Sequence, residues 1–132
     1  MEHSFRYSLK SRAELERLAA KLGVEIPYRE ATSNLLEAVP LNGGRVLANR
    51  FVVHPMEGFD ADLSGTPGEL AFRRYRRYGA GGAALIWFEA TAVVPEGRSN
   101  PAQFWLHAGN VAEYRRLVSE TREAAKAYFS AG

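Results

Sequence analysis

The first clear hydrophobic period in the chain follows Ser11. Apolar side chains recur there three and four positions apart, which is the spacing of one helix face, at Leu15, Leu18, Ala19 and Leu22. Ser11 and Glu14 have the spacing of a capping box, and Gly23 suits the left-handed residue that follows a helix. The pattern therefore predicts a short amphipathic helix between Ser11 and Gly23, which packs on a neighbouring surface rather than carrying chemistry.

A different pattern begins at Leu35, where two short apolar segments flank a turn. The segments are Leu36–Leu41 and Arg45–Leu47, and Asn42-Gly43-Gly44 lies between them. Asn-Gly between apolar runs is a strong hairpin signal, and a proline within one segment suits an edge strand. We therefore expect a hairpin within Leu35–Arg50.

Two later runs are almost continuously apolar. They are Phe51–His54, which Pro55 ends, and Ala83–Phe88. Short runs of this kind, rich in β-branched or large apolar residues, are typical of strands buried on both faces. We predict a strand at each, with Trp87 in the core.

The segment between these strands has the pattern of a capped helix. Thr66 is expected at the N-cap, Pro67 at the first helical position and Glu69 as the partner in a capping box. The expected apolar stripe comprises Leu70, Phe72, Tyr75 and Tyr78. Gly79–Gly82 is expected to break the helix.

After the second strand, Thr91–Gly109 contains two prolines and several polar residues, and we predict a long loop there. Asn110 then has the features of an N-cap, with Glu113 three residues later. A stripe at helical spacing follows, made of Val111, Tyr114, Leu117, Val118, Thr121 and Ala125. These signals predict a final helix over Asn110–Ser130.

Strand, helix, strand, helix in short alternation predicts an α/β fold with a parallel sheet and right-handed crossovers. The carboxyl ends of parallel strands meet at one edge, which brings Pro55–Glu57 near Glu89-Ala90. Two strands cannot cover both edges of a sheet. Neighbours must come from further sequence or from another chain.

The composition excludes some classes of function but does not identify one. The chain has 132 residues, a net charge of +2 and no cysteine. The missing thiols exclude disulfides, thiolate catalysis and cysteine-ligated metals. The longest apolar run falls far short of the roughly 20 residues that span a bilayer, and the charged N-terminus lacks a secretory signal. We expect a cytoplasmic protein that binds neither membrane nor nucleic acid.

Three segments, in this order and at this spacing, resemble the N-terminal part of the NADH:flavin oxidoreductase family, the relatives of old yellow enzyme. They are NRFVVHPMEG at Asn49–Gly58, GTPGELAFRRYRRYGAGGAALIWFEA at Gly65–Ala90 and AVVPEGRSNP at Ala92–Pro101. The family fold is a (β/α)8 TIM barrel that binds FMN at the C-terminal ends of its strands. The resemblance implies a partial barrel, which this chain does not close alone.

Under this resemblance, residues 1–34 form an N-terminal helical extension and residues 35–132 the first part of the barrel. The hairpin is the plug at the bottom of the barrel, and the two apolar runs are its first two strands. Pro55, Met56, Glu57 and Ala90 are then expected to neighbour the flavin. Ala90 lets the backbone approach a flat ring, and Pro55 fixes the turn.

The activity implied by the family is FMN-dependent oxidoreduction. NAD(P)H reduces FMN, which passes hydride to an activated alkene or similar acceptor, and this segment supplies one wall of the flavin site. The family's other catalytic parts have no counterpart here, so no catalytic residue is assigned. The expected partner is a complementary barrel fragment, or a second copy bound through exposed strand edges. The alternative is a non-catalytic remnant or split-enzyme subunit that acts as an interaction module.

Glu57 departs from the pattern of many relatives, which carry threonine or cysteine at this place. A carboxylate fits poorly beside an electron-accepting ring unless it is protonated or turned away. Gln103–Gly109 superficially resembles the family's third-strand motif, but its spacing differs and Asn110 replaces an arginine. We interpret it as a loop, with Trp105 as an anchor.

Other chemistry remains open at this stage. Glu57, Asp60 and Asp62 could form a metal site or a solvated loop, and a carboxylate pair of Glu57 with Glu89 is a glycosidase-like alternative. His54 is expected to be a hydrogen-bonded structural histidine. Four arginines alternate with aromatic residues over Phe72–Tyr78, either as a stacking surface for single-stranded nucleic acid or as the water-facing side of a helix. We favour the solvated loop and the helix face.

Overall fold

The computed structural model describes residues 9–129. These fall into two compact units, one ending at Thr32 and the other beginning at Ser33. Helix α1 lies in the first unit. The second unit contains a hairpin, two pairs of parallel strands and the helices α2 and α3.

The first unit is built on α1, Arg12–Leu22, as the sequence predicts. The Ser11 hydroxyl accepts a hydrogen bond from the Glu14 backbone N–H at 3.3 Å, and Gly23 ends the helix in the left-handed region. The Glu14 carboxylate reaches back to the N–H of Lys10, at 2.8 Å, rather than to that of Ser11. Local capping therefore fixes both ends of α1.

The hairpin of the second unit is shorter than predicted. Strand β1, Val39–Pro40, pairs antiparallel with β2, Val46–Leu47. The residues just before β1 form a 3-10 turn, η1, over Ser33–Leu36, so the first strand cannot begin at Leu36. Gly43 and Gly44 both have positive φ in the turn, a conformation that glycine adopts without steric cost.

Strand β3, Val52–Val53, pairs parallel with β4, Leu85–Ile86. Asn49 is buried beside them and joins their starts: it donates to the Gly82 carbonyl at 2.8 Å and accepts from the N–H of Phe51 at 3.0 Å. The structure thus confirms the two parallel strands.

The expected burial of these strands on both faces is wrong for this unit. Val52 and Leu85 are exposed, and Trp87, expected in the core, is 64% exposed. Among residues 9–129, neither β3 nor β4 pairs with a second strand. The large apolar side chains therefore have no layer to pack against on the open side.

Helix α2, Glu69–Ala80, starts later than the sequence predicts, because Gly68 and not Thr66 is the N-cap. The Thr66 hydroxyl instead contacts the Ser64 hydroxyl at 2.8 Å and accepts from the Asn110 side chain at 3.3 Å. Helix α2 also continues through Gly79, which was expected to break it. The predicted capping box is therefore absent, although the helix itself is present.

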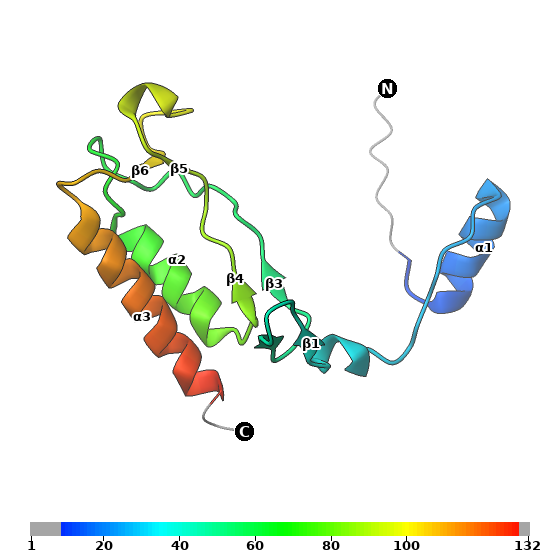
Figure 1. Ribbon diagram of the computed structural model, residues 1–132. Helices are drawn as coiled ribbons and strands as arrows, with labels where there is room; N and C mark the ends of the chain where they lie inside the picture. The colour runs from blue at the N-terminus through cyan, green and yellow to red at the C-terminus, as the bar shows by residue number, and fades with distance from the viewer. Residues whose placement is uncertain (1–8, 130–132) are drawn as a thin grey trace, which may run out of the picture. The chain divides into compact units, whose positions relative to one another are not determined.

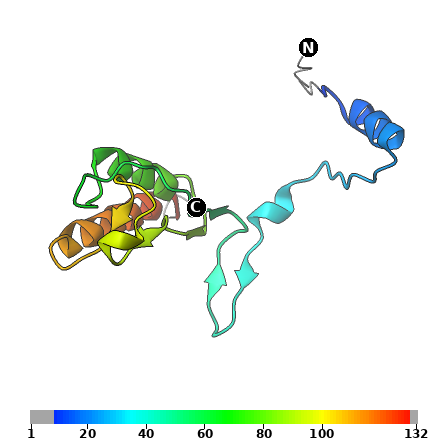
Figure 2. The same ribbon diagram turned by 90° about the horizontal axis from the view of Figure 1, so that it is seen from above.

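Helix α3, Val111–Phe129, follows Asn110 as predicted. The Asn110 side chain does not cap it, however, since its oxygen accepts from the N–H of His107 at 3.0 Å and its amide donates to the Trp105 carbonyl at 2.9 Å. The predicted end at Ser130 lies outside the described residues. Helices α2 and α3 run side by side (Figure 1), and Figure 2 shows the same pairing from above.

The long loop predicted over Thr91–Gly109 contains regular structure. Strand β5, Thr91–Ala92, pairs parallel with β6, Phe104–Trp105, and a 3-10 turn, η2, covers Pro95–Gly97. Phe104 is buried in the core. The strands were missed because the prolines, glycines and polar residues around them favour a loop.

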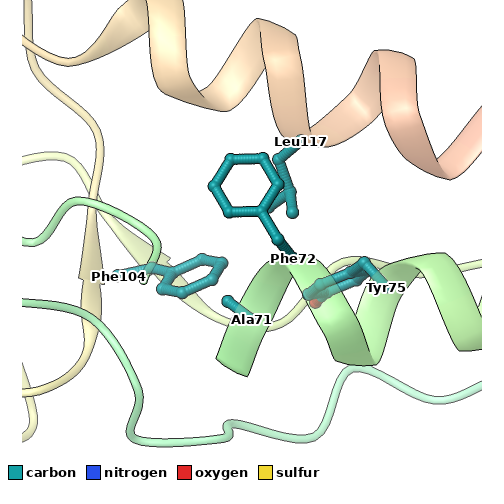
Figure 3. Packing of buried hydrophobic residues seen from close by; sticks show 5 residues of the cluster. All are labelled: Ala71, Phe72, Tyr75, Phe104 and Leu117. Carbon is teal, nitrogen blue, oxygen red and sulfur yellow. The ribbon is translucent and has the colours of Figure 1, made fainter. Parts of the chain in front are cut away.

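The core lies between α2, α3 and β6 (Figure 3) and consists of Ala71, Phe72, Tyr75, Phe104 and Leu117. The Tyr75 ring stacks on Phe88 with centroids 4.2 Å apart, which ties α2 to the segment after β4. Gly79 allows the helices to approach, because a Cβ there would overlap the Thr121 carbonyl oxygen. The core therefore fixes the helices against the strand ends where the candidate site lies.

No helix within the described part of the chain is both long enough and apolar enough to cross a bilayer.

Candidate functional site

The carboxyl ends of β3 and β4 meet at one edge of the parallel pair. Val53 is opposite Ile86, and the pairing continues with the Trp87 N–H donating to the Val53 carbonyl at 3.0 Å. Glu57 and Ala90 each lie four positions beyond the paired residues Val53 and Ile86. The structure thus places the two predicted segments at the same edge.

A tight turn directs the chain out of β3. The Met56 N–H donates to the His54 carbonyl at 2.9 Å, around Pro55, whose fixed φ suits an inverse γ-turn. Met56 is 73% exposed, and Pro55 and Ala90 are exposed as well. The turn therefore presents the apolar side chain of Met56 at the strand ends, and Ala90 adds a small side chain from the segment after β4.

The main chain at this edge offers free donors. Within residues 9–129, the backbone N–H groups of Glu57 and Ala90 have no hydrogen-bond partner. Unpaired N–H groups can donate to carbonyl oxygens or ring nitrogens of a bound molecule. Free donors beside exposed apolar groups are the combination that a flat heteroaromatic ring requires.

Glu57 does not point its carboxylate at open space. One oxygen accepts from the Gln103 amide at 3.2 Å, and the other lies 3.3 Å from the Ser99 hydroxyl. The Asn100 amide is 3.5 Å from that second oxygen. The segment Ser99–Gln103 therefore surrounds the carboxylate with donors.

Gln103 joins the two strand ends. Its amide nitrogen also lies 3.4 Å from the Ala90 carbonyl oxygen, and only 7% of Gln103 is exposed. Sequence reasoning missed this residue, since Gln103–Gly109 was interpreted as a plain loop. A glutamine beside an apolar pair gives no periodic signal.

A second missed residue is Arg74 on α2. Its guanidinium donates to both oxygens of Asp60, at 2.9 and 3.0 Å, and to Glu89 at 2.8 Å. Burial lowers the pKa of Arg74, but the hydrogen bonds to Glu89 and Asp60 raise it further, so the net pKa lies above its ordinary value. Arg74 is therefore charged at any working pH and fixes the acidic loop after β3 to the end of β4.

The sequence carried a signal for Arg74. It lies four residues after Leu70 and four before Tyr78, within the expected apolar stripe. An arginine on that face must either interrupt the core or pair with buried carboxylates. Arg73 and Arg77 are exposed, as the water-facing interpretation predicts, but that interpretation is wrong for Arg74, whose side chain is only 20% exposed.

Glu89 is buried, with 4% of the residue exposed, and both its carboxylate and its backbone N–H form hydrogen bonds. Its carboxylate accepts from Arg74 and from the Gly58 N–H at 2.6 Å, and its own N–H donates to the Tyr75 hydroxyl at 2.9 Å. Burial raises the pKa of Tyr75 to about 12. Glu89 is thus a structural anchor at the end of β4.

These contacts weaken the alternative chemistries. A glycosidase needs two available carboxylates, whereas Glu89 is paired with an arginine. Asp62 accepts from Ser64 and Thr66, and hydrogen bonds from Ser64 hold the pKa of Asp62 below its usual value. Across residues 9–129, no group of histidine, aspartate and glutamate side chains is arranged to hold a metal ion.

The histidines take no part in the edge. His54 is exposed, and the structure gives its side chain no hydrogen-bond partner within residues 9–129, which differs from the hydrogen-bonded structural histidine that the sequence predicts. His107 packs against the Trp105 ring with centroids 4.4 Å apart. His3 lies outside the described residues.

Solved structures similar to this chain were found. The chain resembles old yellow enzymes. A crystal structure of TcOYE with pHBA matches 69% of this chain at 25% identity with a TM-score of 0.58, and 25% of that enzyme is covered. The old yellow enzyme from Trypanosoma cruzi matches 68% of this chain, at 24% identity and a TM-score of 0.57 over 24% of its own length.

The old yellow enzyme from Pichia sp. AKU4542 matches 70% of the chain at 20% identity, with a TM-score of 0.58 over 24% of its length. The chain therefore spans about a quarter of the length of each of these structures. No protein-family model and no curated protein matches it. The likeness shows a mixed helix and strand arrangement with an open parallel pair, in common with part of the old yellow enzyme fold.

Proposed function

We propose that this chain is the N-terminal segment of an FMN-dependent oxidoreductase and supplies one wall of the flavin site. The observation that carries the proposal is the shared edge of β3 and β4, where Glu57 and Ala90 each follow the paired residues Val53 and Ile86 by four positions and are joined by Gln103. Ligand sites on parallel α/β sheets form at the carboxyl ends of the strands. The likeness to old yellow enzymes supports the same placement.

The residues at this edge fit FMN. Ala90 has a small exposed side chain, Met56 offers an exposed apolar one, and the N–H groups of Glu57 and Ala90 are free within the described part of the chain. Pro55 fixes the turn that aims this segment. Bound FMN supplies the hydride chemistry, accepting from NAD(P)H and donating to an activated alkene or similar acceptor.

The partner in this proposal is the complementary part of a barrel. An apolar groove runs along β4 and α3 and is lined by Ala83, Leu85, Ile86, Phe88, Val118 and Phe129, among others. A strand added at the free edge of β4 would cover that groove and complete the hydrogen bonding of the edge. In this proposal residues 1–34 are an N-terminal helical extension and residues 35–132 are the first part of the barrel.

The test is a chimera in which residues 33–129 replace the matched quarter of the Trypanosoma cruzi old yellow enzyme. The proposal predicts that the purified chimera retains FMN, seen as flavin absorbance at one equivalent per chain. The matched control is the same enzyme with its own quarter deleted. A folded chimera that carries no FMN would refute the proposed function.

A second candidate is an interaction module without a cofactor, which associates with a second copy of itself. The exposed apolar residues of the parallel pair, Phe51, Val52 and Leu85, favour it. Sedimentation of the isolated chain distinguishes the two. Defined self-association that persists when a complementary barrel fragment is present would support the module, whereas displacement of the second copy by that fragment would support the barrel.

A further inference from the structure

Gln103 lies where three segments meet at the candidate site. Its backbone belongs to the segment before β6, and its side chain reaches the segments that follow β3 and β4. The side-chain oxygen accepts from the Ser99 N–H at 2.5 Å. Because that oxygen faces a donor, the amide nitrogen is the atom that faces Glu57 and Ala90, and the orientation of the amide is fixed by its surroundings.

The same contacts show how a negatively charged side chain such as Glu57 can lie near a flavin. A carboxylate fits poorly beside an electron-accepting ring, yet its oxygens accept from Gln103, Ser99 and Asn100. All of these donors belong to one short segment, Ser99–Gln103. The charge is therefore engaged by the protein, and the backbone N–H of Glu57 remains for a ligand.

We propose that Gln103 is a positioning residue: its amide clamps Glu57 to Ala90, sets the separation of the two strand ends and turns the Glu57 carboxylate away from the flavin wall. That last consequence rests on the proposed function, whereas the clamp itself does not. The carboxylate acts as an anchor for the wall, and Met56 with the main chain forms its ligand-facing surface.

The experiment exchanges the two side chains in the full chain. Gln103→Glu places two carboxylates face to face, while the new carboxylate still accepts from Ser99. We expect the Tm to fall by about 5 °C at pH 7, as for the loss of about 1 kcal/mol in a small domain. The loss should shrink towards about pH 4.5, where one carboxyl of the pair takes up a proton and becomes a donor.

Adding Glu57→Gln to Gln103→Glu restores a donor opposite an acceptor with the roles reversed. The double variant is expected to recover most of the lost Tm and to lose most of the pH dependence. The remainder stays lost because the Ala90 carbonyl then faces a carboxylate in place of the amide. The matched control adds Glu96→Gln instead, which removes an exposed negative charge from η2 without contacting the clamp. That control should recover little of the Tm.

The clamp is supported if the Tm of Gln103→Glu is restored by adding Glu57→Gln but not by adding Glu96→Gln. It is overturned if the two second changes restore the Tm equally, or if neither restores it. FMN affinity of the chimera carrying the same variants is a separate readout. If the exchange rescues the Tm while no chimera retains FMN, the proposed function fails and the clamp stands. If FMN binds but Gln103→Glu leaves both Tm and affinity unchanged, the clamp fails and the proposed function stands.

Discussion

Arg74 contacts two carboxylates from different segments, Asp60 after β3 and Glu89 after β4. Only 20% of its side chain is exposed, and the carboxylates are less exposed still. Its neighbour Gly58 leaves the space that the guanidinium occupies, since a Cβ there would overlap it. The pairing therefore holds together the two segments that carry the candidate site, the loop after β3 and the end of β4.

Replacing Arg74 with methionine should destabilise the second unit by about 3 kcal/mol, because two buried carboxylates would lose their cation. The loss should become smaller at about pH 4, where carboxyl groups begin to protonate. Urea unfolding at both pH values measures it. Arg73→Met is the matched control, since Arg73 is exposed on the same helix; equal losses for the two variants would contradict the assigned role.

Ionisation of Tyr75 should reduce the stability of the second unit at high pH. Its pKa is raised to about 12 by burial, so the stability it contributes is complete below its ordinary pKa of 10.0 and is lost as the pH rises through about 12. The urea midpoint should fall over this window. Tyr75→Phe should flatten that fall, although it weakens the chain at neutral pH by leaving the Glu89 N–H unpaired. A wild-type midpoint that stays constant up to pH 12 would exclude the effect.

At the scale of elements, the patterns with long periods predicted most of the fold. The α1 stripe with its two caps, the α2 and α3 stripes and the apolar runs of β3 and β4 all lie where the sequence indicates. Strands β5 and β6 were not predicted, because the prolines and glycines around them favour a loop. The Thr66 cap failed for another reason: its hydroxyl contacts the Ser64 hydroxyl and accepts from the Asn110 amide, and the helix begins only after Gly68.

The candidate site was partly predictable for the same reasons. Strand-end residues follow from the alternation of strands and helices, which located Pro55–Glu57 and Ala90. Arg74 and Gln103 depend on contacts between segments distant in the chain, which neither local spacing nor composition encodes. Only the place of Arg74 within an apolar stripe pointed to burial.

Gly79 tests the packing of α2 on α3. Alanine normally favours a helix interior by up to about 1 kcal/mol over glycine. Here the added methyl group would overlap the Thr121 carbonyl, so Gly79→Ala should instead destabilise the unit by about 1–3 kcal/mol. Gly81→Ala at the end of the same helix has negative φ and more space, and should change the Tm little. A stabilised Gly79→Ala variant would show that the helices are not packed as described.

For the whole molecule, the open side of the parallel pair is the main structural fact. Large apolar side chains stay exposed along β3 and β4 because neither strand has a second neighbour among residues 9–129. The solved structures that the chain resembles are about four times as long as the matched part. In our proposal the activity therefore belongs to a completed barrel, to which this chain would bring one wall of the flavin site.

The most direct test of that wall is the FMN dissociation constant of the chimera with a bulky side chain at Ala90. Ala90→Phe fills the space beside the free N–H groups and should weaken FMN binding at least about tenfold, which corresponds to about 1.4 kcal/mol. Ala80→Phe, at an exposed position at the end of α2, should leave the constant unchanged. Unaltered FMN binding by Ala90→Phe in a folded chimera would contradict the account.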